Sequence, residues 1–527
     1  MKGNRKMRMT SFLRQEVLTM RTSTKAQPTI RLHEVKTQGR RIHLRAELEL
    51  DLPLPAQDEH LPATLERAVE DAGQRLKRLL LGQALEHADL QLLLRHTAGK
   101  RGNKVRRRGS APYTFKTVFG TVKVRRSRLQ DKKTGVTHQP AALAWQTPQQ
   151  VCITAGLRHA TEDALLTQSA QNALDAVTDR AGEPDLLCKA ELLKIVHHEG
   201  QDLRQAALGR AAAALDEHPQ ARQLLLPAVA APGPEELAAA AQEEAAAAAP
   251  EGEAEEPSVP LGFAGSEVTA DAVAWEEPRA VDEGWVMVQA DGVITHAQAH
   301  TKQKRLETYT AVVLLAGLSW HFACASPQEL IQEVAGLLAV LGVAEGKRRL
   351  LFLADGARWI REWFEGLAVK DKAMLLCWYH LVKKVGQLLS LACRGRQHRR
   401  EVEEPLLAQL WHGKVEEALS LLRRVREQMK KPEALDELVG YLEARRPYLA
   451  DYKARKEAGL WIASTRVEKF NDQAISARCK HQGMAWTAQG VEALARLQAA
   501  KRNGELDHFR RRGELPAWQE PQLLQAA

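Results

Sequence analysis

Two aspartates at the ends of short apolar runs are the first candidates for chemistry. Asp291 follows residues 285–290, Asp355 follows residues 350–354, and each is followed by glycine. A short apolar run bounded in this way is typical of a buried strand, and open α/β sheets bind ligands beyond the carboxyl ends of their strands. We therefore predict that each aspartate ends a strand and is available to a metal ion or a substrate. For Asp355 the alternative is that it only caps the helix that follows.

Paired carboxylates indicate what that chemistry is. Two carboxylates held side by side repel each other unless a cation lies between them. Two metal ions about 4 Å apart fill this role in polymerases and nucleases, where they activate the attacking oxygen and stabilise the leaving one. Glu468 is the candidate third carboxylate because it begins a helix after a long helical stretch. The alternative is that Thr465-x-x-Glu468 is a capping box, in which Glu468 only starts its helix.

The segments between these acids determine whether they can meet. Three strand-like runs come first, and Ser326-Pro-Gln-Glu329 then predicts a capped helix that continues to Leu341. A fourth strand, a helix and a fifth strand follow. This is the order of a ribonuclease-H-like α/β fold, in which the first and fourth strands are neighbours, so Asp291 and Asp355 are expected to lie together. The five predicted strands cover residues 285–290, 309–315, 320–325, 350–353 and 373–377.

Five short motifs occur in an order that resembles one protein family. In this order they resemble the DDE transposases of bacterial insertion sequences, in particular those of the ISKra and ISLre groups. The resemblance covers roughly residues 100 to 510 and is most specific over 286–500. The motifs are Asp291-Gly292, Asp355-Gly356-Ala357-x-Trp359-Ile360, Cys377-x-x-His380, Val467-Glu468-x-x-Asn471 and Arg478-x-Lys480-x-x-Gly483-Met484-x-Trp486.

The resemblance implies a transposase that binds the terminal inverted repeats of its insertion sequence and catalyses DNA cleavage and strand transfer. Asp291, Asp355 and Glu468 would hold two Mg²⁺ or Mn²⁺ ions, and Cys377 and His380 would shape the active site. The implied partner is double-stranded DNA, both element ends and target, bound by a homo-oligomer. A ribonuclease-H-like nuclease without strand transfer shares these carboxylates and is one alternative. A non-catalytic, transposase-derived DNA-binding protein is the other.

Cys377 and His380 also permit a second metal interpretation. With Cys393 and His398 they give the spacing Cys-x2-His-x12-Cys-x4-His, which superficially matches a tetrahedral zinc site. Against zinc, residues 381–392 are predicted to form one continuous helix, which would hold the two pairs apart.

Positive charge lies almost entirely outside one acidic segment. The net charge is +9, but residues 223–278 contain twelve acids and no Lys or Arg, which leaves 75 − 54 = +21 on the rest. Such a balance predicts a polyanionic partner. Residues 100–133 contain thirteen Lys and Arg with one acid, and a hairpin with a basic face is predicted around Phe119-Gly120. The alternative is a solvated edge that only prevents aggregation.

Nine cations are the candidates for contact with DNA. Arg478 and Lys480, which begin the last motif and are expected on the last helix or just beyond it, are included, although surface cations at a helix end could equally complement its dipole. The other candidates belong to the basic hairpin and the residues leading into it: Arg106, Arg107, Arg108, Lys116, Lys123, Arg125 and Arg126.

These patterns predict an α/β ribonuclease-H-like catalytic domain interrupted by an all-helical insertion and preceded by a basic α+β DNA-binding region. The absence of a membrane-spanning pattern and of a cysteine framework predicts a cytoplasmic, nucleoid-associated protein. The expected parts are a basic and helical region (1–99), the DNA-binding region (100–222), an acidic Ala/Glu/Pro-rich linker (223–280), the first part of the catalytic domain (281–380), the insertion (381–463), and the last helix with the C-terminal tail (464–527).

Overall fold

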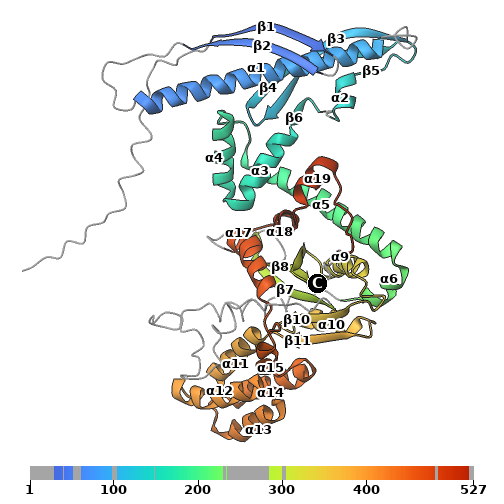
Figure 1. The fold of residues 1–527 in the computed structure, drawn as a ribbon. Helices are drawn as coiled ribbons and strands as arrows, with labels where there is room; N and C mark the ends of the chain where they lie inside the picture. Colours follow the sequence, from blue (N-terminus) through green and yellow to red (C-terminus); the bar gives the residue numbers. More distant parts are fainter. Residues whose placement is uncertain are drawn as a thin grey trace, which may run out of the picture. The chain divides into compact units, whose positions relative to one another are not determined.

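The chain forms two compact units in a computed structural model (Figure 1). One unit comprises Met1–Ala164 and Ala170–Leu192, and the other comprises Leu165–Ser169 and Leu193–Ala527. The structure describes residues 29–38, 41–50, 61–97, 104–146, 149–229, 233, 284–299, 304–480 and 485–521. The predicted acidic linker therefore lies largely outside the described residues.

The first unit contains the predicted basic hairpin. Strands β3 (Val105–Thr117) and β4 (Gly120–Asp131) pair antiparallel, with Thr117 opposite Gly120 across the turn. The hairpin prediction is confirmed. Apolar side chains of both strands pack on Leu81 and Leu85 of the long helix α1 (Leu61–Thr97). The other elements are β1 (Thr29–Gln38), β2 (Arg41–Glu49), β5 (Thr137–His138), α2 (Pro140–Ala144), β6 (Val151–Ile153), α3 (Ala155–Thr167) and α4 (Ala170–Ala181).

The second unit is built on a five-stranded sheet with the strand order β11-β10-β7-β8-β9. The central strand β7 is parallel to β10 and antiparallel to β8. The predicted adjacency of the first and fourth strands is confirmed. The bounds are β7 (Trp285–His296), β8 (Arg305–Leu315), β9 (Leu318–Cys324), α9 (Pro327–Val340), β10 (Arg349–Ala354), α10 (Arg358–Gly366) and β11 (Lys372–Leu376).

The Asp-Gly pair led us to predict that the first strand ends at Asp291, and this prediction is wrong for β7. The strand continues through Gly292 to His296 and pairs with β8 along this whole length. Only the parallel neighbour β10 stops at this level, because it ends at Ala354. Asp291 therefore lies inside a strand, whereas Asp355 follows the end of one.

The insertion is helical throughout, as predicted. Its two ends meet, because Trp378 N–H donates to the Ile462 carbonyl at 2.9 Å. Trp378 also packs between Trp411 and Tyr452, with ring centroids 4.9 and 4.8 Å apart, which fixes the helices around one aromatic cluster. The helices are α11 (Trp378–Ala392), α12 (Arg396–Trp411), α13 (Val415–Val425), α14 (Pro432–Arg445) and α15 (Tyr452–Glu457), with short 3₁₀ turns at Arg426–Gln428 and Arg446–Tyr448.

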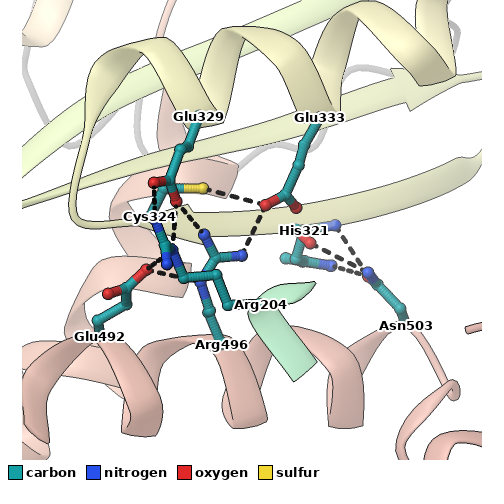
Figure 2. Close-up of polar contacts among 8 residues, drawn as sticks. All are labelled: Arg204, His321, Cys324, Glu329, Glu333, Glu492, Arg496 and Asn503. Atoms are coloured by element: carbon teal, nitrogen blue, oxygen red, sulfur yellow. Dashed lines mark hydrogen bonds and ion pairs between the residues drawn. The ribbon is translucent and has the colours of Figure 1, made fainter. Parts of the chain in front are cut away.

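A buried ion network joins the helices that pack around β9. Figure 2 shows Arg496 reaching from α18 to two carboxylates of α9, with Arg204 of α5 beside it. Arg496 lies 2.6 Å from Glu333 and 2.9 Å from Glu329, and its own side chain is only 3% exposed. The bounds are α5 (Lys189–Glu217), α6 (Pro219–Leu225), α16 (Thr465–Asn471), a π-helical turn (Asp472–Ser476), α17 (Ala477–Cys479), α18 (Ala488–Arg502) and α19 (Leu506–Arg512).

This network also explains why the capping box predicted at Ser326 does not form. Ser326 is the N-cap of α9, but its side chain makes no capping hydrogen bond. Glu329, expected to turn back to the Ser326 amide, is paired with Arg204 and Arg496 instead. Two charged hydrogen bonds to guanidinium groups are stronger than one bond to a neutral amide.

None of the described helices combines the length and the apolarity that crossing a bilayer requires.

Candidate active site

The first two carboxylates are placed by the pairing of β7 with β10. Ala290 and Ala354 are opposite each other in the parallel register, so the residues that follow them, Asp291 and Asp355, leave the two strands at the same level. Both aspartates are partly exposed, although their neighbours in the strands are buried. The predicted meeting of these two acids is confirmed by this register.

The third carboxylate is brought to β7 by a hydrogen-bonded helix start. The side-chain oxygen of Gln289 on β7 accepts from the backbone N–H groups of Arg466 and Val467, at 3.0 and 3.2 Å. These are orphan donors in the first turn of α16, and a buried acceptor from another element satisfies them. Gln289 is two residues before Asp291, so this contact delivers Glu468 to the level of the aspartates.

Asn471 fixes Asp291 from the next turn of the same helix. Its Nδ2 donates to Asp291 Oδ2 at 2.7 Å, and its Oδ1 accepts from Thr310 Oγ1 of β8 at 2.8 Å. The other oxygen of Asp291 accepts from Gly292 N–H at 2.8 Å. Asn471 and Thr310 are buried, so the orientation of the Asp291 carboxylate is set by groups that cannot exchange partners with water.

Cys377 and His380 flank Glu468 at the start of the insertion. Cys377 follows β11, and its Sγ accepts from Ser464 N–H at 3.4 Å. One turn into α11, His380 Nε2 lies 3.3 Å from Glu468 Oε1. The predicted role of this pair in shaping the site is consistent with these contacts, because both residues touch the segment that carries Glu468.

The electrostatics of the site are those of crowded negative charges. Although Asp291 keeps some exposure, the protein packed around it removes most of its water, and this desolvation, together with the negative charge of Asp355, raises the pKa of Asp291 to about 6. Burial and the charge of Asp291 raise the pKa of Glu468 well above its usual value. Burial alone would lower the pKa of His380, but the charges of Cys377, Glu468 and Asp355 raise it to about 10. The site thus places three acidic side chains beside an imidazole whose pKa is raised by their charge.

The chemical type of these side chains matches the divalent ions that the sequence implies, whereas their arrangement does not form a complete metal site. In the part of the chain that the structure describes, no group of three or more His, Cys, Asp and Glu side chains is placed so that it could hold a metal ion. The donors present are carboxylate oxygens, which Mg²⁺ prefers, and Glu468 Oε1 is a buried oxygen that accepts no hydrogen bond and has His380 Nε2 at 3.3 Å. The raised pKa values of Asp291 and Glu468 show that further positive charge would stabilise their ionised forms. Asp291, Asp355 and Glu468 are the residues that would hold such ions.

The capping alternatives have different outcomes at the two acids. Ser464, not Thr465, is the N-cap of α16, and Glu468 lies beside His380 without a capping bond, so the capping box is wrong. Asp355 does accept from Ala357 N–H at 2.8 Å before α10. That bond uses one oxygen of the carboxylate, so Asp355 can hold the turn before α10 and still offer its other oxygen to a metal ion.

The alternative zinc site is also wrong. Cys377 and Cys393 flank opposite ends of the fifteen-residue helix α11, which makes them about 24 Å apart. Cys393 Sγ lies 3.9 Å from Met429 Sδ and is buried. Cys393 therefore cannot bind the same ion as Cys377 and His380.

The glycine of each Asp-Gly pair, Gly292 and Gly356, lets neighbouring side chains pack directly on the backbone next to the aspartate. Gly356 has a φ of +76°, and a Cβ there would lie 2.9 Å from Leu376 Cδ1 and 3.1 Å from Arg445 Nε. A Cβ on Gly292 would collide with a carboxylate oxygen of Glu307. Any side chain at either position would displace a neighbour of the acids.

Residues 339–516 match an uncharacterised protein family (UPF0236). No curated protein matches the chain significantly. The matched region contains Asp355, Glu468 and the insertion, whereas Asp291 lies before it.

The predicted DNA-contacting residues fall into two groups in the structure. Exposed cations remain candidates: Arg106, Arg107 and Arg108 on β3, and Lys123 and Arg125 on β4. Lys116 is held by Glu191 at 2.8 Å and is mostly covered. Lys480, just after α17, is partly exposed and interacts within the protein.

Arg126 and Arg478 are buried, and their prediction as phosphate ligands is wrong. The Arg126 guanidinium lies 4.2 Å from the Tyr113 ring, 4.7 Å from Phe115 and 5.1 Å from Trp145. Arg478 donates to the Leu165 carbonyl at 3.0 Å. Both are structural residues, because a guanidinium enclosed by rings or bonded to a buried carbonyl cannot reach solvent.

Three residues of the site received no role from the sequence, although Asn471 belongs to the motif Val467-Glu468-x-x-Asn471. Gln289 is a polar residue inside an apolar run, and Asn471 is three residues after Glu468, the helical spacing that places both on one face. The third, Arg445, comes from α14 of the insertion and donates to the Gly356 carbonyl at 3.2 Å. No local pattern connects residue 445 with residue 356.

Proposed function

We propose that this protein is a DDE-type DNA transposase with a ribonuclease-H-like catalytic domain. The observation that carries the proposal is the placement of Asp291 and Asp355 at one level of β7 and β10, with the start of α16, which carries Glu468, hydrogen-bonded to Gln289 of β7. Support for the fold comes from the strand order, with three antiparallel strands and two parallel strands added beside the first. The exposed cations of the β3–β4 hairpin support DNA as the substrate.

The residues of the chain have separable roles in this proposal. Asp291, Asp355 and Glu468 would hold two Mg²⁺ or Mn²⁺ ions, which supply activation of the attacking oxygen and stabilisation of the leaving oxygen at phosphorus. Asn471 and Gln289 orient the carboxylates by the hydrogen bonds described above. His380 provides a positive charge beside Glu468, and Cys377 is expected to hold the start of α11 against Ser464.

The substrate of the proposed reaction is double-stranded DNA carrying the terminal inverted repeats of the element. Hydrolysis at the element end leaves a 3′-hydroxyl, which then attacks a phosphodiester of the target DNA and displaces the adjoining 3′-oxygen. Each step exchanges one P–O bond for another, so no oxidant or reductant is required.

The test uses Asp355→Asn. This change removes one charge from the site, and the Asn side-chain oxygen can still accept the hydrogen bond from Ala357 N–H at the turn before α10. DNA that flanks the coding region, with its inverted repeats, is incubated with protein and Mg²⁺, and nicked and joined products are separated. We expect Asp355→Asn to lose cleavage while its affinity for the DNA stays within a few-fold of wild type. Cleavage by the variant at saturating Mg²⁺ would remove Asp355 from the site. Cleavage without joining by the wild type would assign a nuclease instead.

A further inference from the structure

The helical insertion carries a second concentration of positive charge. Residues 378–400, which form α11 and the start of α12, contain six Lys and Arg and no acid. Three exposed cations lie where α11 ends and α12 begins, and two more lie in the segment just before α14. We call these five the insertion patch: Arg394, Arg396, Arg400, Lys430 and Lys431.

Backbone hydrogen bonds hold the two segments of the insertion patch together. The Ala392 carbonyl at the end of α11 accepts from Lys430 N–H at 2.8 Å and from Lys431 N–H at 3.2 Å. Cys393 Sγ lies 3.9 Å from Met429 Sδ. Cations separated by about 35 positions in the sequence therefore share one surface.

Helix electrostatics do not account for this arrangement. Arg396 lies in the first turn of α12, which contains no acid, and Lys431 is the N-cap of α14. The N-terminus of a helix carries partial positive charge, so cations at these two positions oppose the helix dipole. Two other arginines of the insertion are held by acids, Arg399 by Glu403 and Arg426 by Asp436.

Helix α11 connects the insertion patch with the candidate active site. His380, beside Glu468, is twelve residues before Ala392, a distance of about 18 Å at 1.5 Å per residue. The exposed positions of α11 are Tyr379, Lys383, Ser390 and Leu391, and none of them is acidic. Phosphates of one DNA strand are spaced about 3.4 Å along the duplex, so the patch is about five base pairs from the carboxylates.

We propose that the insertion patch binds the phosphate backbone of the duplex that reaches the active site, about five base pairs from the reacting phosphate. This inference rests on the proposed function for the identity of the polyanion, duplex DNA. The insertion is then a clamp that aligns the duplex along α11, in addition to the hairpin of the first unit. Each cation of the patch that binds a phosphate releases a counterion and contributes to the salt dependence of binding.

The test compares two double variants of the full chain with the same change in charge. Arg394→Gln/Lys431→Gln alters the insertion patch. Lys414→Gln/Arg511→Gln alters exposed cations beyond the other end of α12 and on α19. Binding of a 24-base-pair duplex is measured by fluorescence anisotropy over a series of salt concentrations in EDTA, with thermal melting as the check on folding.

We expect the patch variant to lower the slope of log affinity against log salt by about 1.8, or about 0.9 for each phosphate that the protein no longer neutralises. The control variant should leave the slope close to wild type. A patch variant that matches the control overturns the inference. Phosphate-ethylation interference should lose its signal about five positions from the cut site in the patch variant only, and an unchanged pattern there would also overturn it.

These outcomes are distinguishable from failure of the proposed function. Binding in EDTA does not depend on catalysis, so a protein that binds through the patch and never cleaves DNA would refute the transposase alone. A protein that cleaves DNA and keeps its salt slope in the patch variant would refute the clamp alone.

Discussion

Replacement of Asp291 by Asn is expected to stabilise the metal-free protein at neutral pH. The pKa of Asp291 is raised from 3.8 to about 6, and each pKa unit corresponds to about 1.36 kcal/mol. The folded protein therefore holds a proton that the unfolded chain has released between these values. Stability from this group is complete below about pH 4 and declines as the pH rises through 6, by up to about 3 kcal/mol.

The Asn side chain removes this repulsion at a smaller cost. It retains one acceptor oxygen for the bond from Asn471 or from Gly292, so one of the two hydrogen bonds is removed, at about 1 kcal/mol. The expected net gain in the free energy of unfolding is about 2 kcal/mol at pH 7.5. At pH 4.5 the gain should nearly vanish, because the wild-type carboxyl is then protonated in the folded state.

Urea unfolding in EDTA at the two pH values, followed by tryptophan fluorescence, measures the difference. Asp371→Asn, at an exposed position before β11, is the control and should leave the midpoint unchanged at both values. Mg²⁺ supplies a second arm: at ten times its Kd it should stabilise the wild type by about 1.4 kcal/mol and the Asp291 variant by less. A variant that is destabilised equally at both pH values, with no change in its response to Mg²⁺, would refute the repulsion on which the proposed metal site depends.

Three further changes test the site and the hairpin. Glu468→Gln should keep the melting temperature within a degree or two in a thermal scan and lose nearly all DNA cleavage; near-normal cleavage would place the third carboxylate elsewhere. The double variant Lys123→Ala/Arg125→Ala should lower the slope of log affinity against log salt for DNA binding by about 1.8 in anisotropy titrations. Arg126→Ala should leave that slope unchanged. It should cost about 2 to 4 kcal/mol of stability, because the buried rings would no longer pack on a guanidinium. Gly356→Ala should destabilise the protein by about 1 to 3 kcal/mol in urea unfolding and weaken Mn²⁺ binding, because its backbone has a positive φ and its Cβ meets Leu376; unchanged stability would remove the turn as a constraint on Asp355.

The elements that were predictable from the sequence are those with strong local patterns. The hairpin has alternating residues and a turn at Phe119-Gly120, and the strands of the sheet are short apolar runs. The order of these runs then placed Asp291 and Asp355 on neighbouring strands. Glu468 followed from the resemblance and from its place after the insertion.

The elements that were missed depend on contacts distant in the sequence or on ambiguous residues. Gly292 reads as a turn after Asp291, but the antiparallel partner β8 extends the strand past it. The bond from Asn471 to Asp291 spans 180 positions, and no short-range pattern predicts it. Arg126 is different, because its burial follows from the alternation of Val122 and Val124 on the inner face of β4. A period of two applied without regard to charge would have found it.

The bond between Trp378 and Ile462 has a consequence for how the protein acquires its site during folding. Glu468 is separated from the end of β11 by 468 − 376 = 92 positions of chain, and closing an unfolded loop of that length costs about 4 kcal/mol of entropy. A folded insertion presents its two ends already side by side, so it replaces that long loop by a short one. Formation of the insertion should therefore precede docking of α16, and the last carboxylate would reach the sheet only in molecules whose insertion has folded. Slow or defective folding of these helices, far from any reacting atom, would then be observed as a loss of active molecules and not as a change in the rate of each.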